Sequence, residues 1–469
     1  MYREGLAAIS RAVGQLPSLR RGLPTIAFVT DAPYLACDSN GSGTYTMAVL
    51  RSIRSAGYGI HYIYVSPRNR VIRYTVTKEL SRLVTMSVWG YLRFSRTNLS
   101  MSPGDWANAL AVVMQRKLPE SVRPFYLTHV EPRILDPLRL ADSAAVSMSH
   151  GSVPLVCTSP AGLEFARRKL RQVQPDVVIA DRPWMAEVLD GLGPTILKMV
   201  FAHDVLHERA RSFAEYGIPL EDRVLDRESE ARLLAKAQVV VAIQEEEARL
   251  LREILPNREV LTLPMPVILR ECRSIQVPGR CLFVGSNHIQ NVEGLRWILH
   301  RVWPKILESV PEAELRVCGD VCSRIEGTFP KVRFLGRVPD LDGEYSAAQV
   351  CLVPSLAGSG LKIKLVEALS FGRACVATRI GLQGLMALAG TAVALADTPD
   401  EFSDAMCRIL KSPSIRRAME EAARCYVSTH LTPEAVCQPF LERIARHIQA
   451  RACLEPTPAA TGGPRQGEA

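Results

Sequence analysis

The clearest chemical pattern in this sequence is residues 354–367, PSLAGSGLKIKLVE. Three small residues are followed there by two lysines and a glutamate: Gly358, Ser359, Gly360, Lys362, Lys364 and Glu367. Glycine has no Cβ, so backbone N–H groups in such a loop can approach a ligand closely. A lysine adds a full positive charge, and a carboxylate can accept hydrogen bonds from neighbouring hydroxyl groups such as those of a ribose. The stretch therefore predicts a site for an anion, with phosphate as the usual ligand.

The segments around this loop are expected to place it at the end of a strand. VCLVPS is typical of a buried strand, and KIKLVEALSFG is typical of a helix that ends at Gly372. The N-terminus of that helix adds about half a positive charge to the loop. A plain strand-to-helix turn with solvated lysines remains the alternative, because the loop has neither a Walker ending nor the GxGxxG pattern.

The two lysines are expected to have different roles. Two positions along an ideal helix correspond to a rotation of about 200°, so only one of the two side chains would face a bound anion. Lys364 lies three residues before Glu367 and therefore on the same helix face. We expect Lys364 to contact the anion and Lys362 to point away from it.

A second candidate residue is His203, in the segment FAHDV. It follows the apolar run ILKMVFA, so it is expected at the carboxyl end of a strand, where ligands bind in open α/β sheets. A hydrogen-bonded pair with the neighbouring Asp204 is the structural alternative. His207 lies one turn further on, but an HxxxH pair without a glutamate and a third ligand is a poor zinc site.

The rest of the chain alternates strand and helix patterns in two series. The first begins with TIAFVT at 25–30, continues with a loop that contains Gly41 and Gly43, and then forms a helix that ends at Gly57. The second begins with RCLFVGS, after a proline-rich stretch without a clear period. We therefore predict an α/β protein with two Rossmann-like, doubly wound domains that face each other across a cleft.

The predicted organisation has six segments. They are an N-terminal extension over 1–22, an N-terminal, acceptor-side domain over 23–268, a linker over 269–280, a C-terminal nucleotide-sugar-binding domain over 281–428, a C-terminal helix over 429–453 that packs back toward the N-terminal domain, and a disordered tail over 454–469. The tail is too rich in Pro, Gly and Ala to order itself. Residues 70–150 mix helical and irregular patterns, and their order cannot be derived.

Composition narrows the class of protein. Of the 469 residues, 47% are hydrophobic and 22% charged, and no apolar run reaches the ~20 residues of a membrane span. The N-terminus lacks the long apolar region of a signal peptide. Twelve cysteines without a CxxC pair favour reduced thiols in the cytoplasm. The net charge of +9 suits phosphorylated ligands or peripheral contact with the inner face of a membrane, while nucleic-acid motifs are absent.

The C-terminal half carries four motifs in a fixed order: FVGS, LGRVPDL, GSGLKIK followed by EAL, and a glycine-rich T..G..GL pattern. Through them, residues 280–425 resemble the nucleotide-sugar-binding domain of retaining glycosyltransferases of family 4, which have the GT-B architecture. The N-terminal half resembles the family more weakly, through IAFVTDAP, VFAHDV and AQVVVAIQEEE. The resemblance implies transfer of a hexosyl group from a nucleoside diphosphate sugar to an acceptor hydroxyl, with retention of configuration.

The resemblance also implies roles for single residues. Glu367 matches the second glutamate of the family's paired-glutamate motif, which binds the nucleotide ribose. His203 matches a histidine often found near the transferred sugar, and we expect it to act in catalysis together with Lys364, whose charge would stabilise the leaving diphosphate. The other expected donor-binding residues lie in four loops: Gly41, Gly43, Gly285, Ser286, Asn287, Val338, Gly358, Ser359, Gly360, Leu361 and Lys362.

The sequence departs from the family pattern at two places. Ser359 stands eight residues before Glu367, where the first glutamate of the pair is expected. The basic residues of the usual diphosphate loop are also missing near Ser286 and Asn291, although the lysines after the glycine loop can replace their charge. Two alternatives therefore remain: a donor-binding protein without turnover, and a nucleotide-sugar epimerase or a phosphorylase on the same architecture.

The expected partners follow from the same resemblance. They are a nucleoside diphosphate sugar as donor and a glycan, a lipid-linked molecule or a small molecule as acceptor, with no nucleic acid. We expect no metal, because no DxD-like cluster is present, and no cofactor.

Overall fold

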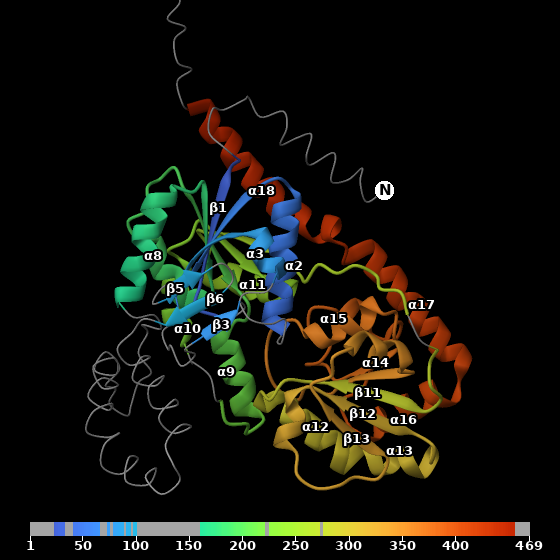
Figure 1. The fold of residues 1–469 in the computed structure, drawn as a ribbon. Helices are drawn as coiled ribbons and strands as arrows, with labels where there is room; N and C mark the ends of the chain where they lie inside the picture. The colour runs from blue at the N-terminus through green and yellow to red at the C-terminus, as the bar shows by residue number, and fades with distance from the viewer. Residues whose placement is uncertain are drawn as a thin grey trace, which may run out of the picture.

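The computed structural model describes residues 23–32, 41–65, 73–75, 78–88, 91–94, 97–100, 160–220, 225–272 and 275–454. In these ranges the chain forms two α/β domains, each built on its own parallel sheet (Figure 1). This is the predicted fold class. The predictions for the extension over 1–22 and for the tail lie outside the described residues, except that Leu454 is the last residue of a helix.

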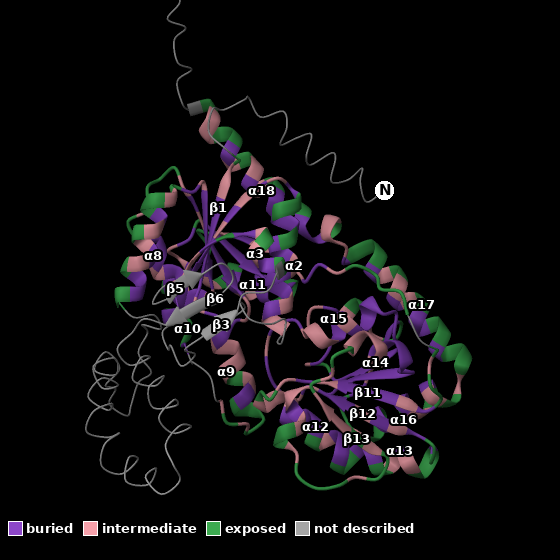
Figure 2. Ribbon diagram, in the orientation of Figure 1, coloured by how far each residue is buried: buried purple, intermediate pink, exposed green. Residues whose placement is uncertain are grey.

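The N-terminal domain contains a seven-stranded parallel sheet in the order β10-β9-β8-β7-β1-β2-β4. Its central strands β1, β7, β8 and β9 are largely apolar and buried because both faces of the sheet are covered there (Figure 2). The strands are β1 (Thr25–Thr30), β2 (Gly59–Tyr64), β4 (Thr85–Val88), β7 (Val177–Asp181), β8 (Leu197–Ala202), β9 (Val239–Ala242) and β10 (Glu259–Thr262). A small antiparallel sheet of order β3-β6-β5 is formed by β3 (Arg73–Thr75), β6 (Thr97–Ser100) and β5 (Tyr91–Phe94).

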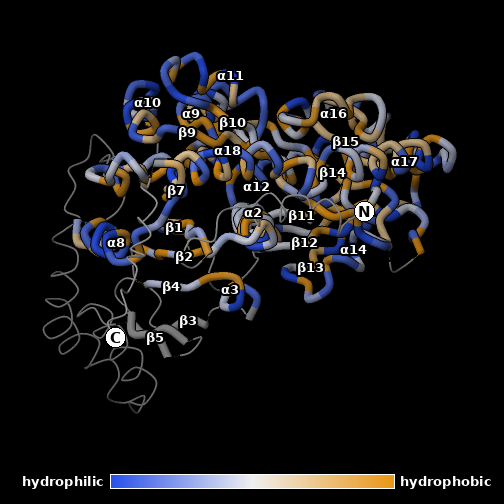
Figure 3. Tube along the Cα trace, turned by 90° about the horizontal axis from the view of Figure 1, so that it is seen from above, coloured by the Kyte–Doolittle hydropathy of each residue, from blue (hydrophilic) through white to orange (hydrophobic). Residues whose placement is uncertain are grey.

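Amphipathic helices cover this sheet, and hydrophilic and apolar residues alternate along α8 and α11 (Figure 3). The helices are α2 (Gly41–Ser55), α3 (Lys78–Leu83), α8 (Pro160–Val173), η3 (Pro183–Leu189), α9 (Leu206–Glu215), α10 (Arg227–Leu234) and α11 (Glu245–Ile254). One prediction is wrong here. Gly41 and Gly43 belong to the first turn of α2 and not to a preceding loop, because the helix begins at Gly41.

The C-terminal domain contains a six-stranded parallel sheet in the order β13-β12-β11-β14-β15-β16. Its strands are β11 (Arg280–Val284), β12 (Glu314–Cys318), β13 (Val332–Gly336), β14 (Val350–Val353), β15 (Cys375–Ala377) and β16 (Val393–Leu395). Its helices are α12 (Ile289–Trp297), η4 (Ile298–Val302), α13 (Trp303–Ser309), η5 (Asp320–Arg324), α14 (Leu341–Ala347), α15 (Ile363–Ser370), η6 (Met386–Leu388), α16 (Pro399–Lys411) and α17 (Pro413–His430).

The last helix, α18 (Pro433–Leu454), lies against the N-terminal domain (Figure 1). Arg443 forms a 2.6 Å ion pair with Glu259, and Arg451 forms a 2.8 Å ion pair with Asp176. The chain therefore crosses between the domains twice, once before β11 and once between α17 and α18.

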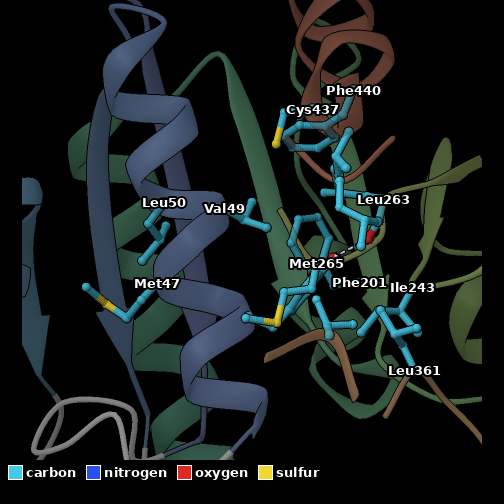
Figure 4. Close-up of a cluster of buried hydrophobic side chains, with 14 of the residues drawn as sticks. Met47, Val49, Leu50, Phe201, Ile243, Leu263, Met265, Leu361, Cys437 and Phe440 are labelled. Atoms are coloured by element: carbon cyan, nitrogen blue, oxygen red, sulfur yellow. Dashed lines mark hydrogen bonds between the residues drawn. The ribbon is translucent and has the colours of Figure 1, made fainter. Parts of the chain in front are cut away.

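One hydrophobic core cluster is continuous across both domains. Figure 4 shows part of it: side chains from α2 and β8 pack with Ile243, with Phe440 of α18 and with Leu361 of the glycine loop. Leu361 is only 7% exposed. This residue was expected to bind the donor, but its side chain fills the core between the domains because it is apolar and the loop is pressed against the N-terminal domain.

Candidate active site

A cavity of about 880 Å³ lies between the domains, and both contribute to its wall. On the N-terminal side the lining residues follow the carboxyl ends of β1, β7 and β8. On the C-terminal side they follow β11, β12, β13 and β14. In open parallel sheets this edge is the usual place for a ligand, so the fold positions the cavity where a substrate site is expected.

The glycine loop connects β14 to α15 and lies at this cavity. Gly358 and Ser359 line it, and Gly358 has a φ of +128°, a conformation that L side chains rarely adopt. The Oγ atom of Ser359 is buried and has no hydrogen-bond partner among the described residues. A buried hydroxyl without a partner is costly, so a ligand that bonds to it would be stabilised.

Gly360 approaches the opposite domain and not the cavity. Its backbone N–H donates to Glu247 Oε1 at 2.7 Å. With φ at +75°, a Cβ on this residue would lie 2.2 Å from Asp204 Oδ1. Glycine is therefore required at this contact between the domains, because any side chain would collide with Asp204. The Gly360 N–H, which was expected to meet a diphosphate, is already bonded to Glu247.

Both lysines line the cavity, which corrects the prediction that Lys362 points away. The helical rotation does not apply to Lys362 because α15 begins only at Ile363 and Lys362 is its N-cap. The Lys362 amine donates to the carbonyl oxygens of Ser359 and Gly360 at 3.0 and 2.8 Å and so ties the loop to itself. Burial lowers the pKa of Lys362 to about 8.

Lys364 reaches toward the loop that follows β11. Its amine donates to Asn291 Oδ1 at 2.5 Å and lies 4.8 Å from the centre of the Phe283 ring. Burial, and then the positive charge of Lys362, lower the pKa of Lys364 to about 7. An anion bound beside this amine would favour its charged form.

Glu367 lies one turn further along α15 and also lines the cavity. The hydroxyl of Tyr345, on α14, donates to Glu367 Oε2 at 3.2 Å. Burial raises the pKa of Glu367 and outweighs this hydrogen bond. One carboxylate oxygen is thus oriented by the protein, and the group can accept hydrogen bonds from a ligand.

The loop after β11 contributes Gly285, Ser286 and Asn291 to the wall, whereas Asn287 is not among the lining residues. The side-chain amide of Asn291 donates to the carbonyl oxygen of Ser286 at 3.1 Å and to its hydroxyl at 3.0 Å. Asn291 therefore connects this loop to Lys364. The expected Val338, which follows β13, also lines the cavity.

His203 lines the opposite wall, directly after β8. Its partner is not Asp204 but Asp181, at the end of the neighbouring β7, and His203 Nε2 and Asp181 Oδ1 are 2.5 Å apart. Thr30 also donates to Asp181, at 2.6 Å. Burial raises the pKa of Asp181, but the charge and the hydrogen bond of His203 outweigh burial and hold that pKa below its usual value.

Asp204 and His207 have separate partners. Asp204 forms an ion pair with Arg209 at 3.3 Å. His207 Nδ1 lies 2.7 Å from Glu230 Oε2, and His207 is not among the cavity-lining residues, so it does not act together with His203.

The two expected glycines of α2 differ in position. Gly41 lines the cavity, and a Cβ there would lie 2.9 Å from Ile363 Cγ1, so the start of α2 touches the start of α15. Gly43 is buried and is not among the lining residues.

The lining residues that the sequence does not predict include Arg182, Trp184, Arg209 and Arg337. Arg182 has a φ of +90°, which is rare outside glycine, and its guanidinium carbon lies 5.4 Å from the Trp184 ring centre. Arg337 binds Asp320 through two contacts of 2.5 Å. Polar residues directly after the strand patterns PDVVIAD and VRFLG were the signal that could have identified Arg182 and Arg337.

In the part of the chain that the structure describes, no group of three His, Cys, Asp or Glu side chains is arranged to hold a metal ion. Among the helices of the described ranges, none has the length and apolar character to cross a membrane.

Comparison with known proteins agrees with this arrangement. Residues 278–412, which include the glycine loop and Glu367, match the family model described as glycosyl transferases group 1. No curated protein sequence matches the chain significantly.

Several solved structures share the fold. Sucrose-phosphate synthase from Thermosynechococcus elongatus is 15% identical with a TM-score of 0.58, over 91% of this chain and 99% of that one. A mutant of S. aureus TarM, in complex with Fondaparinux, alpha-GlcNAc-glycerol and UDP, is 11% identical with a TM-score of 0.60, over 90% and 100%. Anabaena HepE, in complex with UDP and glucose, is 11% identical with a TM-score of 0.55, over 90% and 99%. The chain thus has the GT-B fold.

Proposed function

We propose that this protein is a retaining glycosyltransferase that moves a hexosyl group from a nucleoside diphosphate sugar to an acceptor hydroxyl. One observation carries the proposal: Lys364 and Glu367 on the C-terminal wall share a single cavity with His203 on the N-terminal wall. This arrangement provides a cation for a diphosphate, a carboxylate for a ribose and an imidazole near the reacting sugar.

The C-terminal wall is proposed to hold the donor. Glu367 accepts hydrogen bonds from the ribose hydroxyls, and Lys364 and the N-terminus of α15 lie beside the diphosphate. Negative charge grows on the diphosphate as its bond to the sugar breaks, and these groups stabilise that charge where it develops. The proposal includes no metal and no cofactor.

The N-terminal wall is proposed to act on the sugar and the acceptor. Asp181 fixes the orientation of the His203 ring through Nε2, and this nitrogen is the only ring atom with a hydrogen bond among the described residues. Nδ1 is then available for a hydroxyl group of the transferred sugar or of the acceptor. Because the reacting groups come from both walls, transfer requires the two domains to be together, and closure of the cavity around the donor would expel water.

A donor-binding protein without turnover is the second candidate, and one observation favours it. Ser359 lines the cavity at the position where the resemblance leads one to expect a glutamate. The structure contains no feature that specifically favours an epimerase or a phosphorylase in the described ranges.

The test is a panel of nucleoside diphosphate sugars, measured for thermal stabilisation and for release of the nucleoside diphosphate. Uridine diphosphate sugars come first because the TarM and HepE structures contain UDP. A donor at 100 times its Kd should stabilise the protein by about 2.7 kcal/mol. Stabilisation with release supports the transferase, stabilisation without release with any acceptor supports the second candidate, and no stabilisation contradicts both. The acceptor panel includes glycans, lipid-linked molecules and small sugars, with and without anionic vesicles.

A further inference from the structure

We infer that Glu247, a residue of the N-terminal domain, is a positioning residue that holds the glycine loop of the C-terminal domain and does so as an uncharged carboxylic acid. We call its contact with Gly360, together with the contact of Ser212 with Gly358, the interdomain clasp. The clasp stands on the geometry alone. Its importance for turnover rests on the proposed glycosyl transfer.

The carboxyl group of Glu247 joins three segments at one point. It lies in the first turn of α11, and its Oε1 atom accepts the Gly360 N–H at 2.7 Å and the Val205 N–H at 3.4 Å. Val205 is the N-cap of α9, directly after His203 and Asp204. The residue that holds the glycine loop is therefore bonded to the segment that carries His203.

A second contact of the same kind comes from α9. The hydroxyl oxygen of Ser212 accepts the Gly358 N–H at 3.0 Å. Figure 1 shows α9 extending toward the C-terminal domain, in agreement with this contact. Two backbone N–H groups of one loop are thus satisfied by side chains of the opposite domain, and Ser359 between them is fixed at the cavity wall.

The loop is fixed from within as well. The Lys362 amine donates to the carbonyl oxygens of Ser359 and Gly360, so the loop moves as one piece. If the clasp opens, Ser359 and Lys362 separate from His203 together. Glu247 itself is not among the cavity-lining residues, so it acts by positioning and not by contact with a substrate.

The surroundings of Glu247 favour its uncharged form. The residue is only 3% exposed, and its Oε2 atom has no hydrogen-bond partner among the described residues. A carboxylate in this position would leave a charged oxygen buried without a donor, which is far more costly than a neutral acid. The charges that face it are Asp204 from the loop after β8 and Lys362 at the start of α15. Arg209 on α9 acts on both of these groups, since it is paired with Asp204 and lowers the pKa of Lys362.

Burial, and then the negative charge of Asp204, raise the pKa of Glu247 to about 8, against the hydrogen bond from Gly360 and the charge of Lys362. The contribution of a group with a raised pKa is present at low pH and is lost as the pH rises toward and through that value. The clasp is therefore expected to hold at neutral pH and to weaken above about pH 8.

Hydrogen exchange of the peptide 355–362 in the full-length, ligand-free protein tests the clasp without any donor. At pH 7, Glu247→Gln should leave the protection within about twofold, because an amide oxygen can accept the Gly360 N–H, whereas Glu247→Ala should speed exchange about tenfold. Glu246→Gln, in the same helical turn but exposed, is the matched control and should change nothing.

The pH dependence separates a neutral acid from a carboxylate. The intrinsic rate of amide exchange rises between pH 7 and 9.5 in both proteins. After correction for that rise, peptide 355–362 should lose protection in the wild-type protein and keep it in Glu247→Gln. Equal losses of protection in Glu247→Gln and Glu247→Ala at pH 7 would overturn the neutral-acid assignment, and unchanged exchange in Glu247→Ala would overturn the clasp. If Glu247→Ala does not fold, the wild-type and Glu247→Gln pH profiles still decide the question.

A turnover measurement then tests the link to catalysis. Glu247→Gln should keep kcat at pH 7 and lose the alkaline fall that wild-type protein shows, with nucleoside diphosphate affinity unchanged. A clasp confirmed by exchange, together with an absence of transfer in wild-type protein, would contradict the proposed function and leave the clasp intact. An alkaline fall of equal size in both proteins would overturn the positioning role.

Discussion

The two walls of the cavity carry charge in different ways. On the N-terminal wall, His203 pairs with Asp181 and Asp204 pairs with Arg209. On the C-terminal wall the lysines donate to neutral carbonyl and amide oxygens, and burial lowers their pKa values. Buried amines whose hydrogen-bond acceptors are neutral are suited to an anion, whereas matched pairs are suited to orienting uncharged hydroxyl groups. The walls should therefore respond differently to mutation.

The largest expected effect is on the N-terminal wall. His203→Ala should lower kcat by about 100-fold or more while the affinity for the nucleoside diphosphate changes less than about twofold, since the lost interaction is made mainly in the transition state. Turnover and calorimetric binding measured on one preparation check this. The variant removes the His203 partner of the buried Asp181, so a stability loss of about 1–3 kcal/mol is expected as well. A folded variant with normal turnover would remove His203 from the mechanism.

The second effect concerns the C-terminal wall, where a substitution should weaken nucleotide binding. Lys364→Ala should weaken nucleoside diphosphate binding by roughly 10- to 100-fold, as expected for the loss of a hydrogen bond to a charged group. Lys362→Ala should weaken it less, because the Lys362 amine mainly donates to carbonyl oxygens of its own loop. Calorimetric titrations of both variants measure the difference. A larger loss in Lys362→Ala would exchange the two roles.

Substitution of Glu367 should cause a smaller loss of nucleotide affinity, and this loss should depend on the ribose hydroxyls. Glu367→Ala should lower the affinity for UDP about tenfold, which corresponds to the hydrogen bonds to the ribose hydroxyls. The same titration with 2′-deoxy-UDP is the control. If Glu367 binds the ribose, wild-type protein should lose affinity when the hydroxyl is removed, and the variant should not. An equal loss in both proteins would show that Glu367 acts elsewhere.

The smallest effect is the pH dependence of nucleotide binding. An anion binds best to charged Lys364, and the pKa of this amine in the free protein is lowered to about 7. Affinity should therefore fall severalfold as the pH rises from 6 to 9, because the amine must take up a proton on binding. In Lys364→Ala the same titration series should be flatter. A profile that is unchanged by this substitution would assign the dependence to another group.

Sequence reasoning identified the C-terminal wall better than the N-terminal one. Lys364 and Glu367 belong to one continuous stretch, so a strand, a loop and a helix suffice to place them together. The pairing of His203 with Asp181 depends on β8 lying next to β7, and strand order is not contained in a local pattern. Glu247 was missed for the same reason, because its partner Gly360 is 113 positions away.

Two errors have a local physical cause. The helical period predicts that Lys362 points away from Lys364, but Lys362 precedes the helix, so its side chain does not follow that period. The bare loop was interpreted as an approach to a ligand, yet at Gly360 the neighbour is the other domain. A glycine in such a loop indicates that another group lies close to the backbone, but it does not show whether that group belongs to a ligand or to the protein.

A crystal structure of the protein with bound UDP tests the difference between the walls most directly. The account predicts the ribose hydroxyls within about 3 Å of the Glu367 carboxylate and a phosphate oxygen within about 3 Å of the Lys364 amine. The N-terminal wall should then face the position of the sugar, with His203 still paired to Asp181. A nucleotide whose phosphates lie against Arg182 and Arg209, with the ribose away from Glu367, would contradict it.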